Sequence, residues 1–184
     1  PAEEATPYVM EAIKIVRNKK GFKNLHIMVP FVRSVKELEE VKKLISQSGI
    51  HRSPTLKLWM MVEIPVNVVL LEDFIKVGID GVSVGTNDLT MLMLGTDRDN
   101  DEVAEVYNET DPSVLWALEK IIKTSHVHGI TSSICGEAGS NPEILEKVIP
   151  WGITSVSVSP DAILNTRKTI SEIEKRVILK GKDV

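Results

Sequence analysis

The strongest constraint on the fold is a regular alternation of short apolar or small-residue runs with longer amphipathic segments. Uninterrupted apolar runs are typical of parallel strands buried on both faces, and apolar residues at helical spacing between them indicate helices. The pattern therefore predicts βα units, with one parallel sheet covered by helices. The predicted strands are Leu25–Val32, Leu56–Ile64, Gly81–Gly85, Ile130–Cys135 and Ser155–Ser159.

A doubly wound sheet and a closed barrel both agree with this pattern, and the residues alone leave that choice open. The chain has 184 residues, of which 42% are hydrophobic, so it can bury one core. We therefore expect residues 1–184 to form a single domain. The chain opens at Pro1 directly into a helical pattern, and we expect it to be a piece of a longer protein.

Composition and charge argue against several classes of protein. The net charge is −4, aromatic residues make up 4% of the chain, and no Lys/Arg block alternates with aromatics, so we expect no nucleic-acid partner. No apolar run is long enough to span a membrane, which predicts a soluble protein without membrane contact. The single cysteine, Cys135, suits a reducing compartment, so we expect the cytoplasm.

Polar side chains follow the predicted strands where the strands end. In parallel α/β folds these carboxyl ends share one edge of the sheet, where ligands bind. Glu63 and Asp88 stand at the ends of consecutive strands, so both carboxylates can reach one ion, and such a pair suits Mg²⁺. The same spacing also fits structural roles, in which Glu63 only precedes a helix that starts with proline and Asp88 only caps a turn.

The stretch VGTNDL places polar residues at the end of the third predicted strand. Gly85 allows a ligand to approach the backbone closely, and Thr86 and Asn87 offer hydrogen-bond donors. Asp88 adds a negative charge. Arg98 follows in a polar segment from which a long cationic side chain can reach an anionic substrate, although an arginine there can equally face water.

Cys135 ends the fourth predicted strand, directly before Gly136. A thiol is mostly protonated at neutral pH and can deliver a proton, so Cys135 is a candidate general acid. The alternative is that this lone cysteine is an inert buried side chain.

Several of these motifs together resemble the phosphoenolpyruvate synthases (pyruvate, water dikinases) of the PEP-utilising enzyme family. The resemblance extends over essentially the whole chain. It implies the later part, about five strands, of a TIM-type (β/α)₈ barrel that binds phosphoenolpyruvate (PEP) and pyruvate. The motifs are Met61–Pro65, Val84–Thr90, Leu94–Asp99 and Ile134–Glu143.

The resemblance also implies roles for residues. Glu63 and Asp88 would bind Mg²⁺, and Cys135 would exchange a proton with the enolate carbon of the substrate. Contacts to the substrate's carboxylate or phosphate would come from Gly85, Thr86, Asn87, Asp88 and Arg98.

The whole enzymes of this family form PEP, AMP and phosphate from ATP, pyruvate and water. Their partners to this barrel are a phosphohistidine domain and a nucleotide-binding domain of the same chain. Because this sequence is expected to enter about halfway through the barrel, we expect it to be inactive alone.

Two other functions stay open. The chain can be a non-catalytic assembly or dimerisation domain, or another Mg²⁺-dependent enolate enzyme on a related barrel. An incomplete barrel exposes a sheet edge and apolar surface, so we expect a homo-oligomer.

Overall fold

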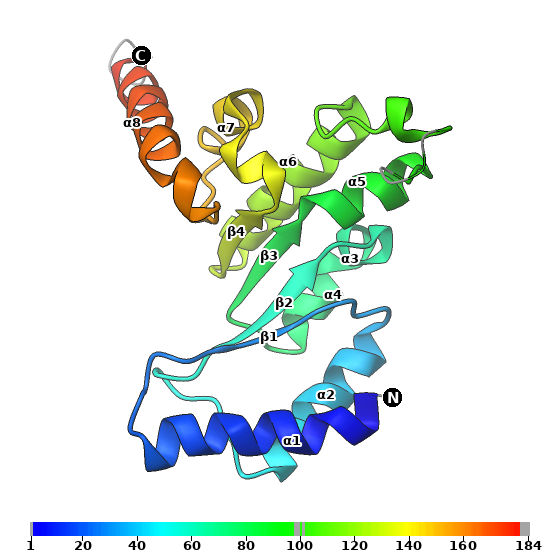
Figure 1. Ribbon diagram of the computed structural model, residues 1–184, viewed down its shortest axis with the longest axis vertical. Helices are drawn as coiled ribbons and strands as arrows, with labels where there is room; N and C mark the ends of the chain where they lie inside the picture. The colour runs from blue at the N-terminus through cyan, green and yellow to red at the C-terminus, as the bar shows by residue number, and fades with distance from the viewer. Residues whose placement is uncertain (1, 98–99, 101, 181–184) are drawn as a thin grey trace.

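The computed structural model describes residues 2–97, 100 and 102–180. Within them, five strands form one sheet in which every neighbouring pair is parallel and the order β1-β2-β3-β4-β5 follows the chain (Figure 1). The predicted parallel sheet of βα units is therefore confirmed. The strands are β1 (Ile27–Val29), β2 (Leu58–Val62), β3 (Gly81–Gly85), β4 (Thr131–Cys135) and β5 (Ser155–Val156).

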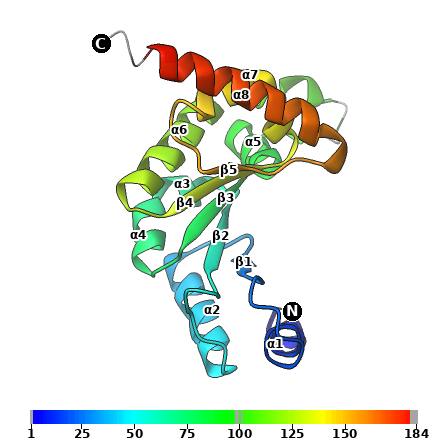
Figure 2. The same cartoon turned by 90° about the vertical axis from the view of Figure 1, so that its left-hand side faces the viewer.

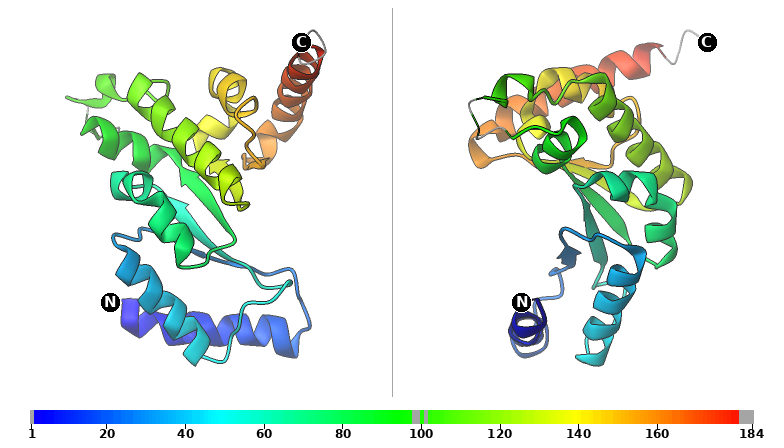
Figure 3. Two further views of the ribbon diagram at one scale, coloured as in Figure 1. Left: turned by 180° about the vertical axis from the view of Figure 1, so that it is seen from behind. Right: turned by 90° about the vertical axis from the view of Figure 1, so that its right-hand side faces the viewer.

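Helices cover one face of the sheet. The sheet lies in front of α4 (Leu71–Lys76) and α6 (Pro112–Val127) in Figure 1, and the reverse view in Figure 3 shows these helices covering it. Figure 2 shows α1 and α8 at opposite ends of the molecule. The α-helices are α1 (Ala2–Lys14), α2 (Val35–Gln47), α3 (Pro65–Val69), α4 (Leu71–Lys76), α5 (Thr86–Leu94), α6 (Pro112–Val127), α7 (Pro142–Val148) and α8 (Ile163–Lys180). A π-helical turn spans Ile15–Lys19, and 3₁₀ turns span Ala104–Val106, Glu137–Ser140 and Pro160–Ala162.

No helix in the described part of the chain combines the length and the apolar composition needed to cross a membrane.

Local signals explain several helix boundaries. The Ser34 side chain accepts a hydrogen bond from the N–H of Glu37, which caps α2, and Gly49 follows the helix with a φ of 82°. Asp111 and Asn141 cap α6 and α7 in the same way, and each precedes a proline in the first helical turn. These caps place the helices directly after the loops at the carboxyl ends of the strands.

The core lies between the sheet and the helices. Leu58, Met60 and Val62 of β2 are buried, whereas Trp59 and Met61 between them are only half-buried. This alternation is expected of a sheet with one covered face, because successive side chains of a strand point to opposite faces. The hydrophobic effect therefore holds the helices on one side of the sheet.

The other face of the sheet is a hollow of about 280 Å³. Met28 of β1 is 45% exposed there, so β1 is not buried on both faces as its apolar sequence predicts. The difference arises because no described element covers this face. The hollow is lined by His26, Ile27, Met28, Trp59, Ser83, Ser133, Ser155 and Ser157.

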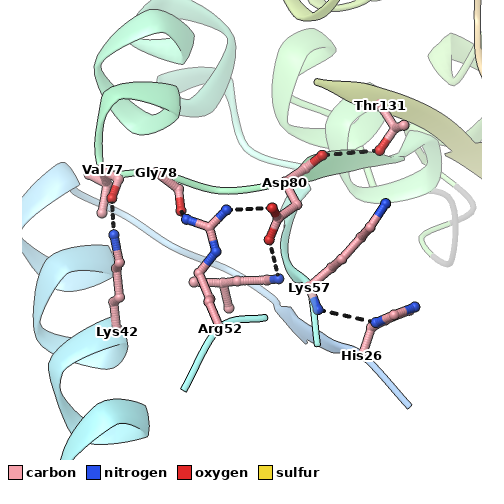
Figure 4. Close-up of polar contacts among 9 residues, drawn as sticks. His26, Lys42, Arg52, Lys57, Val77, Gly78, Asp80 and Thr131 are labelled. Carbon is pink, nitrogen blue, oxygen red and sulfur yellow. Dashed lines mark hydrogen bonds and ion pairs between the residues drawn. The ribbon is translucent and has the colours of Figure 1, made fainter. Parts of the chain in front are cut away.

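Asp80 joins the strands to each other at the amino-terminal edge of the sheet (Figure 4). Its carboxylate accepts a hydrogen bond from the N–H of Leu58 at 2.8 Å and pairs with the guanidinium of Arg52. Arg52 also donates to the carbonyl oxygen of Gly78, and the Thr131 hydroxyl donates to that of Asp80 at 3.2 Å. This network fixes the relative positions of the first residues of β2, β3 and β4.

Two boundaries differ from the sequence pattern. The pattern predicts one helix over residues 65–78, but Leu70, with φ −102° and ψ 24°, separates α3 from α4. The pattern also predicts a long polar segment after the third strand, whereas α5 begins at Thr86, immediately after β3. The residues that looked like a loop are therefore the first turn of a helix.

Candidate active site

Three of the predicted site residues meet at the carboxyl-terminal edge of the sheet. Gly85 and Cys135 are paired in the register of β3 and β4. A Cβ atom built on Gly85 would lie 2.9 Å from both Cβ and Oε2 of Glu63, so Glu63 packs directly against the glycine. The structure thus brings the ends of β2, β3 and β4 together.

Glu63 is a buried carboxylate, with 4% of the residue exposed. Its Oε1 accepts a hydrogen bond of 2.6 Å from the N–H of Phe31, whose φ of 49° is left-handed. Burial raises the pKa of Glu63 above its ordinary value, the Phe31 hydrogen bond opposes this rise, and the negative charge of Asp88 adds to it. The positive charge of a cation beside Glu63 and Asp88 would stabilise the ionised carboxylates and so oppose this rise.

Asp88 lies in the first turn of α5 and is half-buried. Among the described residues, no three His, Cys, Asp or Glu side chains gather as a metal-binding group. A site at Glu63 and Asp88 would therefore have two protein carboxylates. This donor set fits Mg²⁺, which is commonly held by one or two carboxylates and completes its coordination with water and substrate oxygens.

Asn67 is a part of the site that sequence reasoning missed. Its side chain is fully buried, and its Nδ2 donates a hydrogen bond of 2.7 Å to the carbonyl oxygen of Val32. Its Oδ1 accepts longer hydrogen bonds from the N–H groups of Glu63 at 3.4 Å and Ile64 at 3.3 Å. Asn67 therefore ties the loop after β1 to the end of β2. The available signal was an amide residue in the first turn of a helix that starts with proline.

Thr86 and Gly136 hold the end of β4 close to the start of α5. The Thr86 hydroxyl, which is fully buried, donates a hydrogen bond of 3.0 Å to the carbonyl oxygen of Cys135. Gly136 has a φ of 89°, and a Cβ atom there would lie 2.8 Å from Thr86 Oγ1 and 3.0 Å from Asn87 Oδ1. Only glycine suits this position, because both its backbone conformation and its contacts exclude a side chain. The predicted contact of Thr86 with a substrate stays a prediction.

The thiol of Cys135 is partly exposed and donates to the carbonyl oxygen of Val84, with Sγ 3.2 Å from the oxygen. Cys135 and Asn87 line a pocket of about 350 Å³ at this edge of the sheet. The lining residues that sequence reasoning did not single out for a role are Gly136, Glu137, Ser140, Ser157, Val158 and Ser159.

The other predicted site residues that the structure describes do not line the pocket of Cys135 and Asn87. Glu63 and Asp88 are not among the residues that line this pocket, and they lie beside it toward β2. Arg98 lies outside the described residues.

Residues 3–175 match the family described as "PEP-utilising enzyme, PEP-binding domain". A probable phosphoenolpyruvate synthase of Methanocaldococcus jannaschii is 44% identical over 170 residues, which are 92% of this chain and 14% of the relative. The phosphoenolpyruvate synthase of Aeropyrum pernix is 43% identical over 180 residues, or 96% of this chain and 22% of the relative. A probable phosphoenolpyruvate synthase of Staphylothermus marinus is 44% identical over 97% of this chain and 22% of its own length.

The similarity therefore covers nearly all of this chain but less than a quarter of each of these relatives.

Proposed function

The chain belongs to the family of PEP-utilising enzymes, and we propose from this that it is the carboxyl-terminal part of the PEP/pyruvate-binding domain of a phosphoenolpyruvate synthase. The whole protein would form PEP, AMP and phosphate from ATP, pyruvate and water. Its phosphohistidine and nucleotide-binding domains would lie elsewhere in the same protein. The identity of 43% to relatives with this name, over 96% of the chain, supports this assignment.

One observation carries the proposal for the site. Gly85 is paired with Cys135 on one side and packs against the Glu63 carboxylate on the other. A charged group that can hold a cation and a thiol that can exchange a proton thus flank one glycine, where a small substrate can reach the backbone. This combination suits an enolate reaction, because the cation stabilises the enolate oxygen and the thiol exchanges the proton at carbon.

Glu63 and Asp88 would hold Mg²⁺. When bound, Mg²⁺ supplies positive charge that stabilises the negative oxygen of an enolate. The Phe31 N–H orients the Glu63 carboxylate, and Asn67 fixes the backbone on both sides of it. Such supporting contacts hold a metal-binding side chain in its orientation before the metal binds.

Cys135 would move the proton. In the direction of pyruvate, its S–H bond breaks and a C–H bond forms at the methylene carbon of the enolate, leaving a thiolate. In the direction of PEP, the thiolate takes a proton from the methyl group of pyruvate. The hydrogen bond from Sγ to the carbonyl oxygen of Val84 fits a protonated thiol, whose proton would turn from this oxygen toward the substrate before transfer.

The substrate's carboxylate and phosphate would be bound by groups from β3, α5 and the following segment. Gly85 contributes its backbone and Asn87 its amide, and Arg98 contributes a positive charge. Thr86 and Asp88 complete this set, in which Thr86 also positions Cys135 through its hydrogen bond to the Cys135 carbonyl oxygen.

The open sheet would form the later part of a TIM-type barrel, with residues 1–184 as a portion of that single domain. The hollow on its uncovered face supports this, because Met28 and Trp59 there are apolar side chains suited to a closed interior. A homo-oligomer and a cytoplasmic location are part of the same proposal, the latter because Cys135 is the single cysteine.

Substitution of Cys135 tests the proposal in the full-length protein. Cys135→Ala should abolish turnover of pyruvate but preserve phosphoryl exchange between ATP and the histidine domain, because only the proton transfer at carbon is lost. Ser133→Ala, two residues earlier on the same strand and outside the pocket, is the matched control and should preserve both reactions. Loss of both partial reactions in Cys135→Ala would instead assign the thiol a structural role.

A further inference from the structure

A second polar pocket, of about 220 Å³, lies at the opposite edge of the sheet from the candidate active site. It is formed by the end of α1 and by the segments that precede β1 and β2. The described residues that line it include Lys14, Arg17, Lys23 and His51, with no Asp or Glu among them. Because the chain carries a net charge of −4, this local excess of positive charge is not general to the protein. We call it the basic pocket.

Arg17 is the buried part of the basic pocket, with 7% of the residue exposed. Its Nη1 donates to the carbonyl oxygens of Lys23 at 3.1 Å and Leu25 at 2.6 Å, and its Nη2 donates to Thr55 Oγ1 at 3.1 Å. These neutral acceptors satisfy hydrogen bonds but supply no negative charge. Among the described residues, no carboxylate forms an ion pair with Arg17. Burying a cation without a counter-charge is unfavourable, so the pocket favours an anion.

The backbone around Arg17 is also unusual. Arg17 lies in the π-helical turn Ile15–Lys19, and such turns often occur at functional sites. The Nζ of Lys23 donates a hydrogen bond of 2.9 Å to the carbonyl oxygen of Arg17, which keeps this ammonium group at the π-helical turn. Lys14 has only a partly exposed pair with Glu11 at 3.8 Å. Such a pair is weak, so Lys14 can turn toward an anion.

We propose that the basic pocket binds a small phosphate-bearing anion. The guanidinium of Arg17 and the ammonium groups of Lys14 and Lys23 are donors without acceptor capacity, and they match the oxygens of a phosphate. The volume of about 220 Å³ limits the ligand to phosphate itself or to a phosphomonoester with a small organic part. Since the pocket joins α1 to the segments before β1 and β2, the bound anion holds this helix against the sheet.

The test measures equilibrium binding of inorganic phosphate to the full-length protein at constant ionic strength. The double variant Lys14→Gln/Lys23→Gln should lose one phosphate site per chain, or bind it at least about tenfold more weakly, because two charge-assisted hydrogen bonds are removed. Lys19→Gln/Lys20→Gln is the matched control. It removes the same charge from neighbouring positions that do not line the pocket, and it should bind phosphate like the wild type.

A second variant covers the case in which loss of the Lys23 hydrogen bond prevents folding. Lys14→Gln/His51→Gln changes two lining residues whose side chains form no hydrogen bond with the described part of the chain, and it should also lose the site. Equal phosphate binding by wild type, pocket variants and control overturns the proposal.

Competition distinguishes the ligand class. Glycerol phosphate should displace inorganic phosphate more readily than succinate does, and equal displacement by succinate overturns the assignment to phosphate. The proposal does not depend on the proposed enzyme activity, because Cys135→Ala should leave phosphate binding at the basic pocket unchanged.

Discussion

Replacing Gly85 by alanine should weaken Mg²⁺ binding, because the new methyl group would need space that Glu63 occupies. The added Cβ would lie 2.9 Å from Glu63 Cβ and Oε2 and 3.1 Å from Met61 Cε. The end of the Met61 side chain can move. The Cβ of Glu63 is attached to the end of β2, so relief of this overlap requires the carboxylate or the strand to shift.

The magnitude follows from the contacts that would change. Overpacking of this kind lowers the free energy of unfolding by about 1–3 kcal/mol. A shift of Glu63 would also break its hydrogen bond with the N–H of Phe31. Loss of a contact that orients a metal ligand typically reduces metal affinity by about 10- to 100-fold, and we expect a decrease in this range for Gly85→Ala.

The assay is a titration of the full-length protein with Mn²⁺, followed by electron paramagnetic resonance in the absence of nucleotide, with Mg²⁺ as competitor. Gly81→Ala is the matched control. It lies on the same strand at the other edge of the sheet, where a Cβ would overlap Thr131 Oγ1 and lie 2.9 Å from Trp59 Cε2. Both variants should be less stable, but only Gly85→Ala should lose metal affinity. Unchanged affinity in Gly85→Ala would refute the assignment of Glu63 as a metal ligand.

Three further predictions concern stability, measured by urea unfolding with tryptophan fluorescence. Asp80→Ala should lower the free energy of unfolding by about 2–4 kcal/mol, because its carboxylate accepts a hydrogen bond from the N–H of Leu58 and also pairs with Arg52. Arg52→Ala removes only the ion pair and should lower the free energy of unfolding by about 1 kcal/mol. Equal losses in the two variants would contradict this difference. Asn67→Ala should cost about 2–4 kcal/mol by leaving backbone groups of two loops unpaired, and a loss below about 1 kcal/mol would contradict its bridging role. Without metal, the raised pKa of Glu63 means that the folded protein takes up a proton at a higher pH than the unfolded chain does. The free energy of unfolding of the wild type, relative to that of Glu63→Gln, should therefore increase as pH falls through the raised pKa toward 4.5, and this increase should be lost as pH rises. A difference between the two proteins that does not depend on pH would contradict the raised pKa.

The sequence allowed the parallel sheet to be predicted, and with it the edge at which the candidate site residues lie. Alternating runs identified all five strands of the described chain. Glu63 and Cys135 were identified because polar residues that end parallel strands must lie at one edge of the sheet. These conclusions depend on short-range patterns and on the one-directional geometry of βα units.

Other features depended on contacts between residues far apart in the sequence, which a local sequence pattern does not predict. Asn67 looked like an ordinary helical residue, and only the fold brings its amide to the carbonyl oxygen of Val32, 35 positions away. Arg17 falls in the helical pattern that opens the chain and was not singled out, and only the π-helical turn and the segments before β1 and β2 bury it. The first turn of α5 was read as a loop because Gly85 to Asp88 are polar or small, although a glycine at the N-cap permits a helix to begin there.

By itself, the sequence determined that this chain forms a parallel sheet with helices, and which residues stand at the ends of its strands. Hydrophobic periodicity is sufficient for that, because it specifies which side chains must leave water. Only the tertiary structure decided that Glu63, Gly85 and Cys135 touch in succession, that one face of the sheet stays open, and that a buried arginine lacks a counter-charge in the described chain. These properties depend on strand register and on packing between segments far apart in the chain, which local residue preferences do not specify.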